Sequence, residues 1–448
     1  MKKHLKRLLP SRLLLGYHYF LARAATLYYR FPSRGMIIVG VTGTKGKTST
    51  ANFLWAALMA GGMQTGIITT ANIRVGREEW LNPYHMTMPG PFALQKLLAK
   101  MRRAGCRYAI VETTSEGIKQ HRHVGIEYDV AIFTNLTPEH LRSHGGSFEE
   151  YKKTKGKIFA ALSSSRRKML NGTRIPKVII AGSGEHAPYF LGFFADRAVT
   201  FGVGPKAGLR AEHIEPAADG VSFRVGSAAF HLAIPGEFNV SNALPAIIIA
   251  RTAGVDDAAI AEGFASLKTI PGRMERIDMG QNFTVFVDYA HEGESVRKVL
   301  ETAQAIGKQG GSIIVLLGAE GGGRDIGKRK VMGALTGSRA RYVVVCNVDP
   351  YEDDPQKIAE DIATAAEQAG KVREKNLFVI LDRRQGIRKA LSLARHGDIV
   401  LITGKGAEQS IILGGVSIPW DDRRVVREEL GRLHSPPAAD ATGSAVLS

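Results

Sequence analysis

Short apolar runs alternate with longer segments of mixed polar and apolar residues through most of the chain. The runs that most resemble buried strands are residues 36–41, 107–111, 129–133, 284–287, 312–317, 342–345 and 398–402. Strands that alternate with helices in this way form parallel sheets covered by helices. The pattern therefore predicts an α/β fold, with a second strand–helix series that starts after residue 271.

The first apolar run leads into a glycine-containing loop and then a helical segment. Residues 42–48 read Thr-Gly-Thr-Lys-Gly-Lys-Thr, and Val41 takes the first glycine position of the general phosphate-loop pattern. Glycines let backbone N–H groups approach phosphate oxygens, the lysine adds charge and the threonine hydroxyl ligates Mg²⁺. A chance glycine-rich turn would not explain the strand before and the helix after. We predict a nucleotide site formed by Gly43, Thr44, Lys45, Gly46, Lys47, Thr48 and Ser49.

Polar residues follow the next two apolar runs. Glu112 follows residues 107–111, and Thr134 and Asn135 follow residues 129–133. Open α/β sheets bind ligands at the carboxyl ends of their strands. Glu112 is therefore a candidate Mg²⁺ ligand of the Walker-B kind, and an ordinary strand-end carboxylate is the alternative.

Two further features lie between the candidate strands. His140 and His144 are four residues apart, so both imidazoles would share one face if the segment is helical, as a metal site or as a structural pair. The basic run 151–157 would usually be a solvated helix face. Alternatively, repulsion between like charges lowers the pKa of one lysine and leaves a neutral, reactive amine.

The second half carries fewer distinct signals. Residues 178–233 read only weakly as strands, and Asn239 and Asn242 could cap the following apolar helix or contact a ligand. Beyond residue 271, polar residues again follow the apolar runs, at 288–291, 346–347 and 404–406. The basic, glycine-rich loop 321–329 directly follows a strand, which suits an anionic substrate.

Composition limits the classes of function. The 448-residue chain has a formal net charge of +18 and only two cysteines, Cys106 and Cys346. Two cysteines provide neither a disulfide framework nor a thiolate metal site, and they fit a reducing cytoplasm. The charge suits nucleotides, nucleic acid or a membrane surface, but no nucleic-acid module is recognisable and a generally cationic surface is an equal explanation.

The N-terminal segment, residues 1–33, is basic and contains the apolar run 13–22. Arg23 and Arg30 interrupt it well short of the roughly 20 residues that span a bilayer. We predict an amphipathic helix that either packs on the next domain or lies on an anionic membrane surface. The Pro- and Ala-rich tail from Ser435 is predicted to be disordered.

Together the motifs resemble the Mur ligase family, and most closely its E-type branch, the UDP-N-acetylmuramoyl-tripeptide synthetases. The supporting stretches, in order between Gly40 and Asp422, are T-G-T-K-G-K-T-S, E-T-T-S-E-G, T-N-L-T-P-E-H-L, Y-K-K-T-K-G-K-I-F, F-N-V-S-N, P-G-R-M-E-R, D-Y-A-H, G-G-G-R-D-I-G-K-R, G-K-G-A-E and P-W-D-D-R. The resemblance implies a central P-loop-type parallel sheet domain at residues 36–267 and a Rossmann-like C-terminal α/β domain at 268–434. A basic segment, 1–35, would precede them, and the tail, 435–448, would follow.

The resemblance also implies roles for individual residues. Lys47 and Thr48 would hold ATP–Mg²⁺, Glu112 and His140 would ligate the metal, and Lys155 would carry a carbamate close to it. Repulsion from the other lysines of the basic run, Lys152, Lys153 and Lys157, would free the Lys155 amine for CO₂. ATP would be contacted by Asn239, Arg273, Asp288 and His291, with Arg273 and Asp288 presented by a mobile C-terminal domain. Substrates would be contacted by Thr87, Ser115, Gln120, Arg122, Asp349, Tyr351, Gly404 and Glu408.

The sequence departs from the family pattern in several places. Only about thirty-five residues precede the phosphate-loop strand, so we expect the usual N-terminal uridine-nucleotide domain to be missing. Met88 replaces the second of the paired threonines before a proline. Tyr351 stands where many E-type enzymes have an arginine that grips the distal carboxylate of diaminopimelate, and Ala407 replaces a histidine beside the retained Glu408. These departures favour another incoming amino acid.

Three functions remain open from the sequence. The favoured one is an ATP-dependent carboxylate–amine ligase that acts through an acyl phosphate and adds an amino acid to a UDP-N-acetylmuramoyl-peptide-like precursor. The second is a ligase of this architecture with a poly-amino-acid or folate acceptor. The third is a non-catalytic P-loop module that binds nucleic acid or tethers partners at a membrane. A pure scaffold would not need to retain all five of Lys47, Glu112, His140, Lys155 and Asp288, which argues against this function. We expect a cytoplasmic monomer acting on ATP, an amino acid and a carboxylate acceptor, with no nucleic-acid partner and with membrane contact through residues 1–33 left open.

Overall fold

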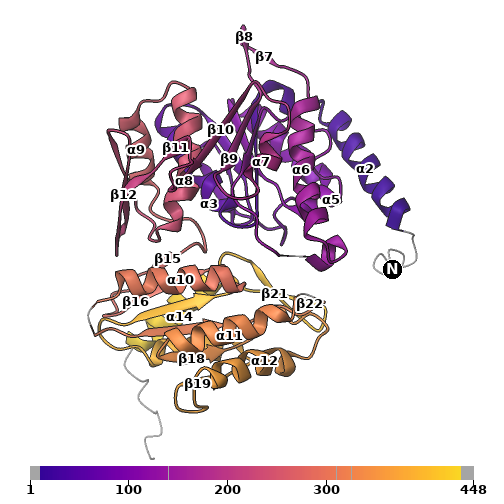
Figure 1. Ribbon diagram of the computed structural model, residues 1–448. Coiled ribbons are helices and arrows are strands. Elements are labelled where there is room, and N and C mark those ends of the chain that lie inside the picture. The colour runs from indigo at the N-terminus through magenta and orange to yellow at the C-terminus, as the bar shows by residue number, and fades with distance from the viewer. Residues whose placement is uncertain (1–10, 140, 309, 324, 435–448) are drawn as a thin grey trace, which may run out of the picture. The chain divides into compact units, whose positions relative to one another are not determined.

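The computed structural model describes residues 11–139, 141–308, 310–323 and 325–434 (Figure 1). Residues group into two compact units, Met1–Met274 and Glu275–Ser448. The start of the basic segment, His140 and the expected tail lie outside the described residues. Each unit is built on a sheet dominated by parallel strands, which confirms the predicted α/β fold.

The main sheet of the first unit has the order β11-β10-β9-β6-β1-β5-β2-β3-β4. Its strands are β1 (Ile37–Thr42), β2 (Thr65–Ile68), β3 (Asn72–Val75), β4 (Glu78–Leu81), β5 (Tyr108–Glu112), β6 (Val130–Phe133), β9 (Val178–Gly182), β10 (Arg197–Gly202) and β11 (Leu209–Arg210). β1 pairs in parallel with β5 and β6, with Val41 opposite Glu112 and Thr42 opposite Phe133. This register brings the end of β1 next to Glu112 and to residues 134–135.

Helices cover both faces of this sheet (Figure 1). They are α2 (Ser11–Tyr28), α3 (Lys47–Ala60), α4 (Pro91–Arg103), α5 (Ser115–Lys119), α6 (Phe148–Ser164), α7 (Ala187–Leu191), α8 (Phe238–Thr252) and α9 (Asp257–Ser266), with 3-10 turns η1 (Pro32–Gly35) and η2 (Leu141–His144). α3 packs against α8 and α9, and the buried Phe53 and Phe264 rings meet edge to face 5.8 Å apart. The phosphate-loop helix is thus fixed along its length by other helices.

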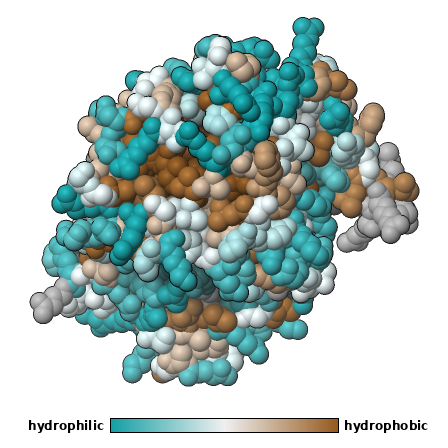
Figure 2. Space-filling view, turned by 45° about the horizontal axis from the view of Figure 1, so that its top comes forward, coloured by the Kyte–Doolittle hydropathy of each residue, from teal (hydrophilic) through white to brown (hydrophobic). Residues whose placement is uncertain are grey.

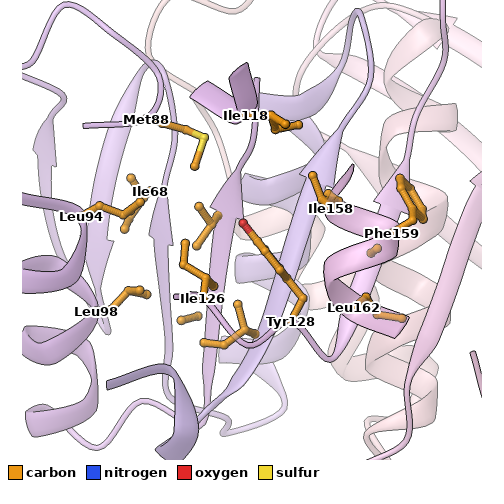
Figure 3. Close-up of a cluster of buried hydrophobic side chains, with 14 of the residues drawn as sticks. Ile68, Met88, Leu94, Leu98, Ile118, Ile126, Tyr128, Ile158, Phe159 and Leu162 are labelled. Carbon is orange, nitrogen blue, oxygen red and sulfur yellow. The ribbon is translucent and has the colours of Figure 1, made fainter. Parts of the chain in front are cut away.

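The opposite face carries the core shown in Figure 3. Tyr128 lies between the side chains of α4 and those of α6, such as Leu98 and Ile158 (Figure 3). Its ring would be 2.7 Å from a Cβ on Gly40 in β1. A side chain at that position would therefore displace the ring, which explains a glycine inside a buried strand.

Residues 178–233, where the sequence signals were weak, form strands. Besides β9, β10 and β11 they include an antiparallel sheet of β12 (Glu212–Ala217), β13 (Gly220–Val225) and β14 (Ala228–Leu232), and a hairpin of β7 (Met169–Leu170) and β8 (Thr173–Arg174) precedes them. Phe230 of β14 contacts Phe264 of α9 with ring centroids 6.0 Å apart. The small sheet therefore extends the packing around α3.

The second unit has a sheet in the order β15-β16-β20-β17-β18-β19, parallel except at β15. Its strands are β15 (Glu275–Ile277), β16 (Thr284–Asp288), β17 (Ile313–Leu317), β18 (Tyr342–Val345), β19 (Leu377–Val379) and β20 (Ile399–Thr403), and β21 (Ser410–Leu413) pairs with β22 (Val416–Pro419). Its helices are α10 (Gly293–Ile306), α11 (Gly327–Arg339), α12 (Pro355–Gln368), α13 (Arg383–Ser392) and α14 (Asp422–His434). The four predicted strands of this half are all present.

The N-terminal segment forms α2, which packs against α4. Tyr28 and Phe92 bring their rings to 6.1 Å, and Thr26 is buried beside Gly125. Across the described ranges, no helix has both the length and the apolar character needed to cross a bilayer.

Candidate active site

Two glycines shape the loop after β1. Gly43 and Gly46 have φ angles of +145° and +82°. A Cβ on Gly43 would lie 2.0 Å from Thr134 Oγ1, and one on Gly46 would lie 2.1 Å from Asn242 Oδ1. Gly46 is also the N-cap of α3, where backbone N–H groups lack intrahelical acceptors and the helix dipole is positive. The loop is thus a tight cradle that suits an anion.

Residues 134 and 135 support this loop from the neighbouring strand. Asn135 accepts from the backbone N–H of Thr44 through its carbonyl (2.8 Å) and from that of Lys45 through Oδ1 (2.9 Å). Thr134 Oγ1 and Asn135 Nδ2 both donate to the carbonyl of Lys45, at 2.7 and 3.1 Å. The polar residues after β6 therefore fix the loop's conformation.

Glu112 is buried against the start of α3. Its Oε2 accepts from Thr48 Oγ1 at 2.8 Å and from the Thr70 N–H at 2.9 Å, and its Oε1 accepts from Thr70 Oγ1 at 3.0 Å. Thr70 also lies 2.7 Å from the hydroxyl of Thr87. A carboxylate among hydroxyls is the oxygen-rich donor set that Mg²⁺ prefers. The residues present therefore fit that ion, with Glu112 and Thr48 as its holders, whereas His140 is outside the described residues.

Two lysines converge on one carbonyl of the loop. Lys47 Nζ donates to Gly43 O at 3.1 Å and to Thr44 O at 2.7 Å, while Lys155 Nζ of α6 donates to Gly43 O at 2.8 Å. Lys155 is almost fully buried, with its Nζ 4.5 Å from the centre of the Tyr151 ring. Within the described ranges neither lysine forms an ion pair, whereas Lys45 pairs with Glu139 at 2.7 Å.

Burial lowers the pKa of Lys47 and lowers that of Lys155 well below its ordinary value, and the repulsion between the two lysines adds to the shift of Lys155. The sequence analysis attributed this effect to Lys152, Lys153 and Lys157, and that attribution is wrong. Lys152 and Lys153 instead form ion pairs with Glu149 and Glu150 at the start of α6. These acids neutralise both lysines, so desolvation and the repulsion from Lys47 dominate the lowering of the Lys155 pKa.

Other expected nucleotide contacts lie close to the loop. Asn239 Nδ2 donates to Pro235 O at 2.9 Å, and its Oδ1 accepts from Asn242 at 3.1 Å, which places this pair beside Gly46. Arg273 donates to Thr48 Oγ1 at 3.2 Å. The first compact unit extends to Met274 and so includes Arg273. Ser49 is buried in the first turn of α3.

The expected substrate residues of the first unit also gather. Arg122 donates to the carbonyl of Met88 and, through its other amino group, to Gln120 Oε1 at 2.6 Å. Thr87 is joined to Glu112 through Thr70, and Ser115 is buried at the start of α5. Arg122 therefore holds the segment that carries Thr87.

At the carboxyl edge of the second sheet, Lys405 is fully buried between two carboxylates. Its Nζ lies 2.8 Å from Asp349 and 2.5 Å from Glu408. Glu408 also accepts from the Tyr289 hydroxyl at 3.1 Å, and Asp349 accepts from the Ile412 N–H at 2.8 Å. The two acids raise the pKa of Lys405 by more than burial lowers it.

The remaining expected residues of this unit lie along the same edge. Asp288 ends β16 and accepts from the Ala290 N–H at 2.7 Å, and the Gly404 N–H donates to its carbonyl at 3.1 Å. The His291 ring contacts Tyr289 at 4.5 Å. Tyr351 donates its N–H to Ile412 O at 3.2 Å, so it follows Asp349 into the same loop.

Two cations of the loop 321–329, Lys328 and Arg329, already have acidic partners, and Arg324 lies outside the described residues. α11 begins at Gly327, and Lys328 is buried between Glu292 and Glu320 at 3.0 Å from each. Arg329 pairs with Asp361 at 2.8 Å. Glu292 and Asp361 are distant in sequence, so the loop's composition gave no sign of them, whereas Glu320 directly precedes the loop.

The matches to known families and relatives agree with this geometry. Mur ligase middle domain matches residues 41–250, and Mur ligase, glutamate ligase domain, matches residues 272–406. The chain is 37% identical over 425 residues to the UDP-N-acetylmuramyl-tripeptide synthetase of Roseiflexus sp. (strain RS-1), covering 92% of this chain and 82% of the relative. The chain belongs to the Mur ligase family. This Mur ligase is an ATP-dependent ligase, and the resemblance to the E-type branch is confirmed.

Further relatives of this Mur ligase include the UDP-N-acetylmuramoyl-L-alanyl-D-glutamate–2,6-diaminopimelate ligase of Geobacillus kaustophilus (strain HTA426), 35% identical with 91% of this chain and 81% of the relative covered. A solved ligase of that name has a TM-score of 0.59 at 26% identity, over 90% of this chain and 79% of its own. The folylpolyglutamate synthase of Mycobacterium tuberculosis complexed with ADP has a TM-score of 0.68, over 94% and 96% of the two chains. At 20% identity that likeness concerns the fold alone.

Sequence reasoning missed two residues of this Mur ligase's candidate site. Thr70 bonds Glu112 through both its backbone and its hydroxyl, yet it follows a short strand in a run without a distinct motif. Lys405 stood in the recognised G-K-G-A-E stretch, and its position between two glycines could have marked it. Its burial between Asp349 and Glu408 depends on the fold of the whole edge.

Proposed function

We propose that this Mur ligase adds an amino acid to the carboxylate of a UDP-N-acetylmuramoyl-peptide-like precursor, using ATP. The observation that carries the proposal is the pairing of Thr48 with buried Glu112 beside two lysines whose hydrogen bonds, among the described residues, go to backbone carbonyls. Such a group of donors is incomplete without an anion, and a nucleotide triphosphate supplies one at the start of α3. The names of the relatives point to the same class of acceptor.

In this proposal a carboxylate oxygen of the acceptor attacks the γ-phosphorus and the bond to ADP breaks, which yields an acyl phosphate. The amine of the incoming amino acid then attacks the acyl carbon, and phosphate leaves with the former carboxylate oxygen. Mg²⁺ would supply charge neutralisation on the phosphates. Lys47 and the N–H groups at residues 43–48 would bind and orient the γ-phosphate, and Glu112 and Thr48 would hold the metal.

Lys155 is proposed to carry a carbamate. Its lowered pKa leaves a larger share of neutral amine near neutral pH, because burial and Lys47 both disfavour the ammonium. The neutral amine attacks CO₂, forms an N–C bond and releases one proton. The product is an anion next to Lys47 and close to the loop, where it relieves the repulsion between two cations.

The incoming amino acid is proposed to lack the distal carboxylate of diaminopimelate. Tyr351 offers no pair of parallel N–H donors, the arrangement by which arginine binds a carboxylate. Lys405 on the same edge is already paired with Asp349 and Glu408, so this lysine is not available to a second carboxylate. Asp288 and His291 are the residues by which this unit would take part in the ATP reaction.

Phosphate release by the purified full chain tests the proposed function. ATP, Mg²⁺ and a panel of UDP-muramoyl peptides would be crossed with lysine, ornithine, diaminopimelate and neutral amino acids, with folate substrates as a second panel. We expect release only when a muramoyl peptide and an amino acid are both present, with diaminopimelate among the poorest amines. Release with the folate panel alone, or none with either panel, would overturn the proposal.

Lys155→Ala tests the carbamate separately. We expect loss of the amide product and partial recovery with added short carboxylates, because a free anion can then occupy the space of the carbamate. Lys157→Ala, an exposed lysine of the same helix, is the matched control and should retain activity. Full activity of Lys155→Ala without any added carboxylate would refute this role.

A further inference from the structure

Helix α2 presents an apolar stripe to solvent. Leu13, Tyr17, Phe20 and Leu27 are 62%, 54%, 67% and 61% exposed. Their spacing of four, three and seven residues places them on one face of a helix. In Figure 2 the right-hand edge of the molecule, where α2 lies, accordingly carries brown and tan side chains. We call these four residues the outer stripe.

The opposite face of α2 is buried against the rest of the first unit. Ala22, Ala25 and Thr26 are almost completely buried, and the helix packs against α4. Thr26 also abuts Gly125, where an added Cβ would lie 1.9 Å from its hydroxyl. Since protein covers this face along α2, the helix cannot be surrounded by lipid. The outer stripe is therefore surplus to the core, and contiguous apolar surface of this kind marks an interaction site.

The charge around the outer stripe restricts what can cover it. Residues 1–77 contain no aspartate or glutamate, and the first acidic residue of the chain is Glu78. The cations of the first 35 residues are Lys2, Lys3, Lys6, Arg7, Arg12, Arg23, Arg30 and Arg34. Arg23 and Arg30 are exposed and lie on α2 or directly after it. A second copy of this segment would bring the same charges face to face, which disfavours self-association.

We propose that α2 docks on an anionic lipid surface. The outer stripe lies among the upper acyl chains, while Arg23 and Arg30 contact the phosphate headgroups. Apolar side chains and a cluster of cations each give weak, reversible membrane binding, and together they give stable attachment. Tyrosine is suited to such a position because its ring is apolar and its hydroxyl remains hydrated. This attachment is separate from the ligase reaction.

Vesicle flotation of the full chain tests the proposal. Vesicles of phosphatidylcholine alone would be compared with vesicles in which a third of the lipid is phosphatidylglycerol, at low and high salt. We expect binding to the anionic vesicles that falls at least tenfold at high salt, with little binding to the neutral ones. Equal binding to both kinds of vesicle, or to neither, would overturn the proposal.

Two variants separate the apolar contribution from the charge. Tyr17→Ser/Phe20→Ser/Leu27→Ser removes most of the outer stripe, and Arg23→Glu reverses one neighbouring charge; we expect each to lower vesicle binding, the triple variant by tenfold or more. Phe194→Ser, at a position 65% exposed elsewhere on the first unit, is the matched control and should bind as the parent does. Thermal melts establish that the variants fold.

The oligomeric state in solution tests the alternative that a second copy of the chain covers the outer stripe. Light scattering of the parent chain and the triple variant would show whether the outer stripe joins two copies. We expect the same mass for both. A dimer that the triple variant dissolves would assign the stripe to a second copy and overturn the lipid proposal, as would triple-variant binding to anionic vesicles at the parent's level.

Discussion

Two lysines beside the loop of the first unit and two at the sheet edge of the second have opposite kinds of partner. In the first unit Lys47 and Lys155 donate to backbone carbonyls of the phosphate loop, and the pKa of each is lowered. In the second unit Lys328 and Lys405 each lie between two carboxylates, and the pKa of each is raised. Burial acts on all four in the same direction, so the difference comes from the partners.

Lysines without a counter-ion suit a binding site, whereas lysines paired with carboxylates suit a structural framework, by which we mean the ion pairs that hold loops in place. An ammonium without a counter-ion is costly in a protein interior, and an incoming anion removes that cost. Under the proposed function, phosphate bound at the loop in the first unit would remove this cost. Lys328 and Lys405 already have their anions, so they hold loops at the sheet edge in place and have little left to offer a ligand.

The largest expected effect comes from breaking the framework. Lys405→Met leaves the buried Asp349 and the partly buried Glu408 side by side without their cation, and we expect a loss of about 3–5 kcal/mol in the free energy of unfolding. Urea unfolding followed by circular dichroism measures it. The exposed Lys375→Met is the control and should change stability by about 0.5 kcal/mol or less. Equal losses in both variants would contradict the framework role.

Lys47→Met should separate activity from stability in the first unit. We expect kcat/KM for ATP-dependent phosphate release to fall about 10²–10³-fold, as when one pre-oriented donor is removed from a reacting anion. The free energy of unfolding should not decrease, because the substitution removes a desolvated charge that has no ion-pair partner among the described residues. Lys96→Met on the exposed face of α4 is the control, with both quantities unchanged. A marked loss of stability in Lys47→Met would place it with the framework lysines.

Gly46→Ala should weaken nucleotide binding more than a matched glycine substitution elsewhere. Both Gly46 and Gly62 have positive φ, so alanine costs about 1–2 kcal/mol at either position. Only at Gly46 would the new Cβ meet a neighbour, Asn242 Oδ1 at 2.1 Å. We expect the KM for ATP to rise about tenfold in Gly46→Ala, a shift of about 1.4 kcal/mol, and to stay unchanged in Gly62→Ala. Titration with ATP measures both, and equal KM values would argue against a tight cradle.

The pH dependence of stability should show the smallest effect. Because the folded-state pKa of Lys155 is lowered, the unfolded chain binds more protons from that pKa up to the ordinary value of 10.5, so stability rises with pH there. Lys155→Met should reduce this rise by up to about 1.4 kcal/mol per pH unit. Lys405 has a raised pKa, so its contribution is complete below 10.5 and is lost above it. Unfolding free energies measured from pH 7 to 10 would test the sign, and an unchanged slope in Lys155→Met would contradict it.

The pattern of apolar runs was sufficient to predict the α/β fold, because the strands of a helix-covered parallel sheet are apolar on both faces. β16, β17, β18 and β20 were all predicted from such runs. The phosphate loop was also readable, since its strand, loop and helix are contiguous in sequence. β12–β14 were weak signals because one face of that small sheet is exposed and its strands carry charged residues such as Glu212 and Glu215.

The errors of sequence reasoning concern charge. Lys152 and Lys153 are neighbours of Lys155 in sequence, yet their ion pairs lie on the outer face of α6. Lys328 and Arg329 read as cations available to a substrate, and each has an acidic partner from a distant segment. Whether a charged side chain has a counter-ion depends on the residues that pack against it. Distance along the sequence does not reveal which residues these are.

By itself, the sequence determined the α/β architecture, the strand–loop–helix at residues 37–60 and the family, because each depends on residues that are local or ordered along the chain. Only the tertiary structure decided that Lys47 and Lys155 share the carbonyl of Gly43 without an ion pair, while Lys405 is buried between Asp349 and Glu408. The physical reason is that the cost of a buried charge depends on the partners and the solvent around it. Both are set when segments that are distant in sequence pack together.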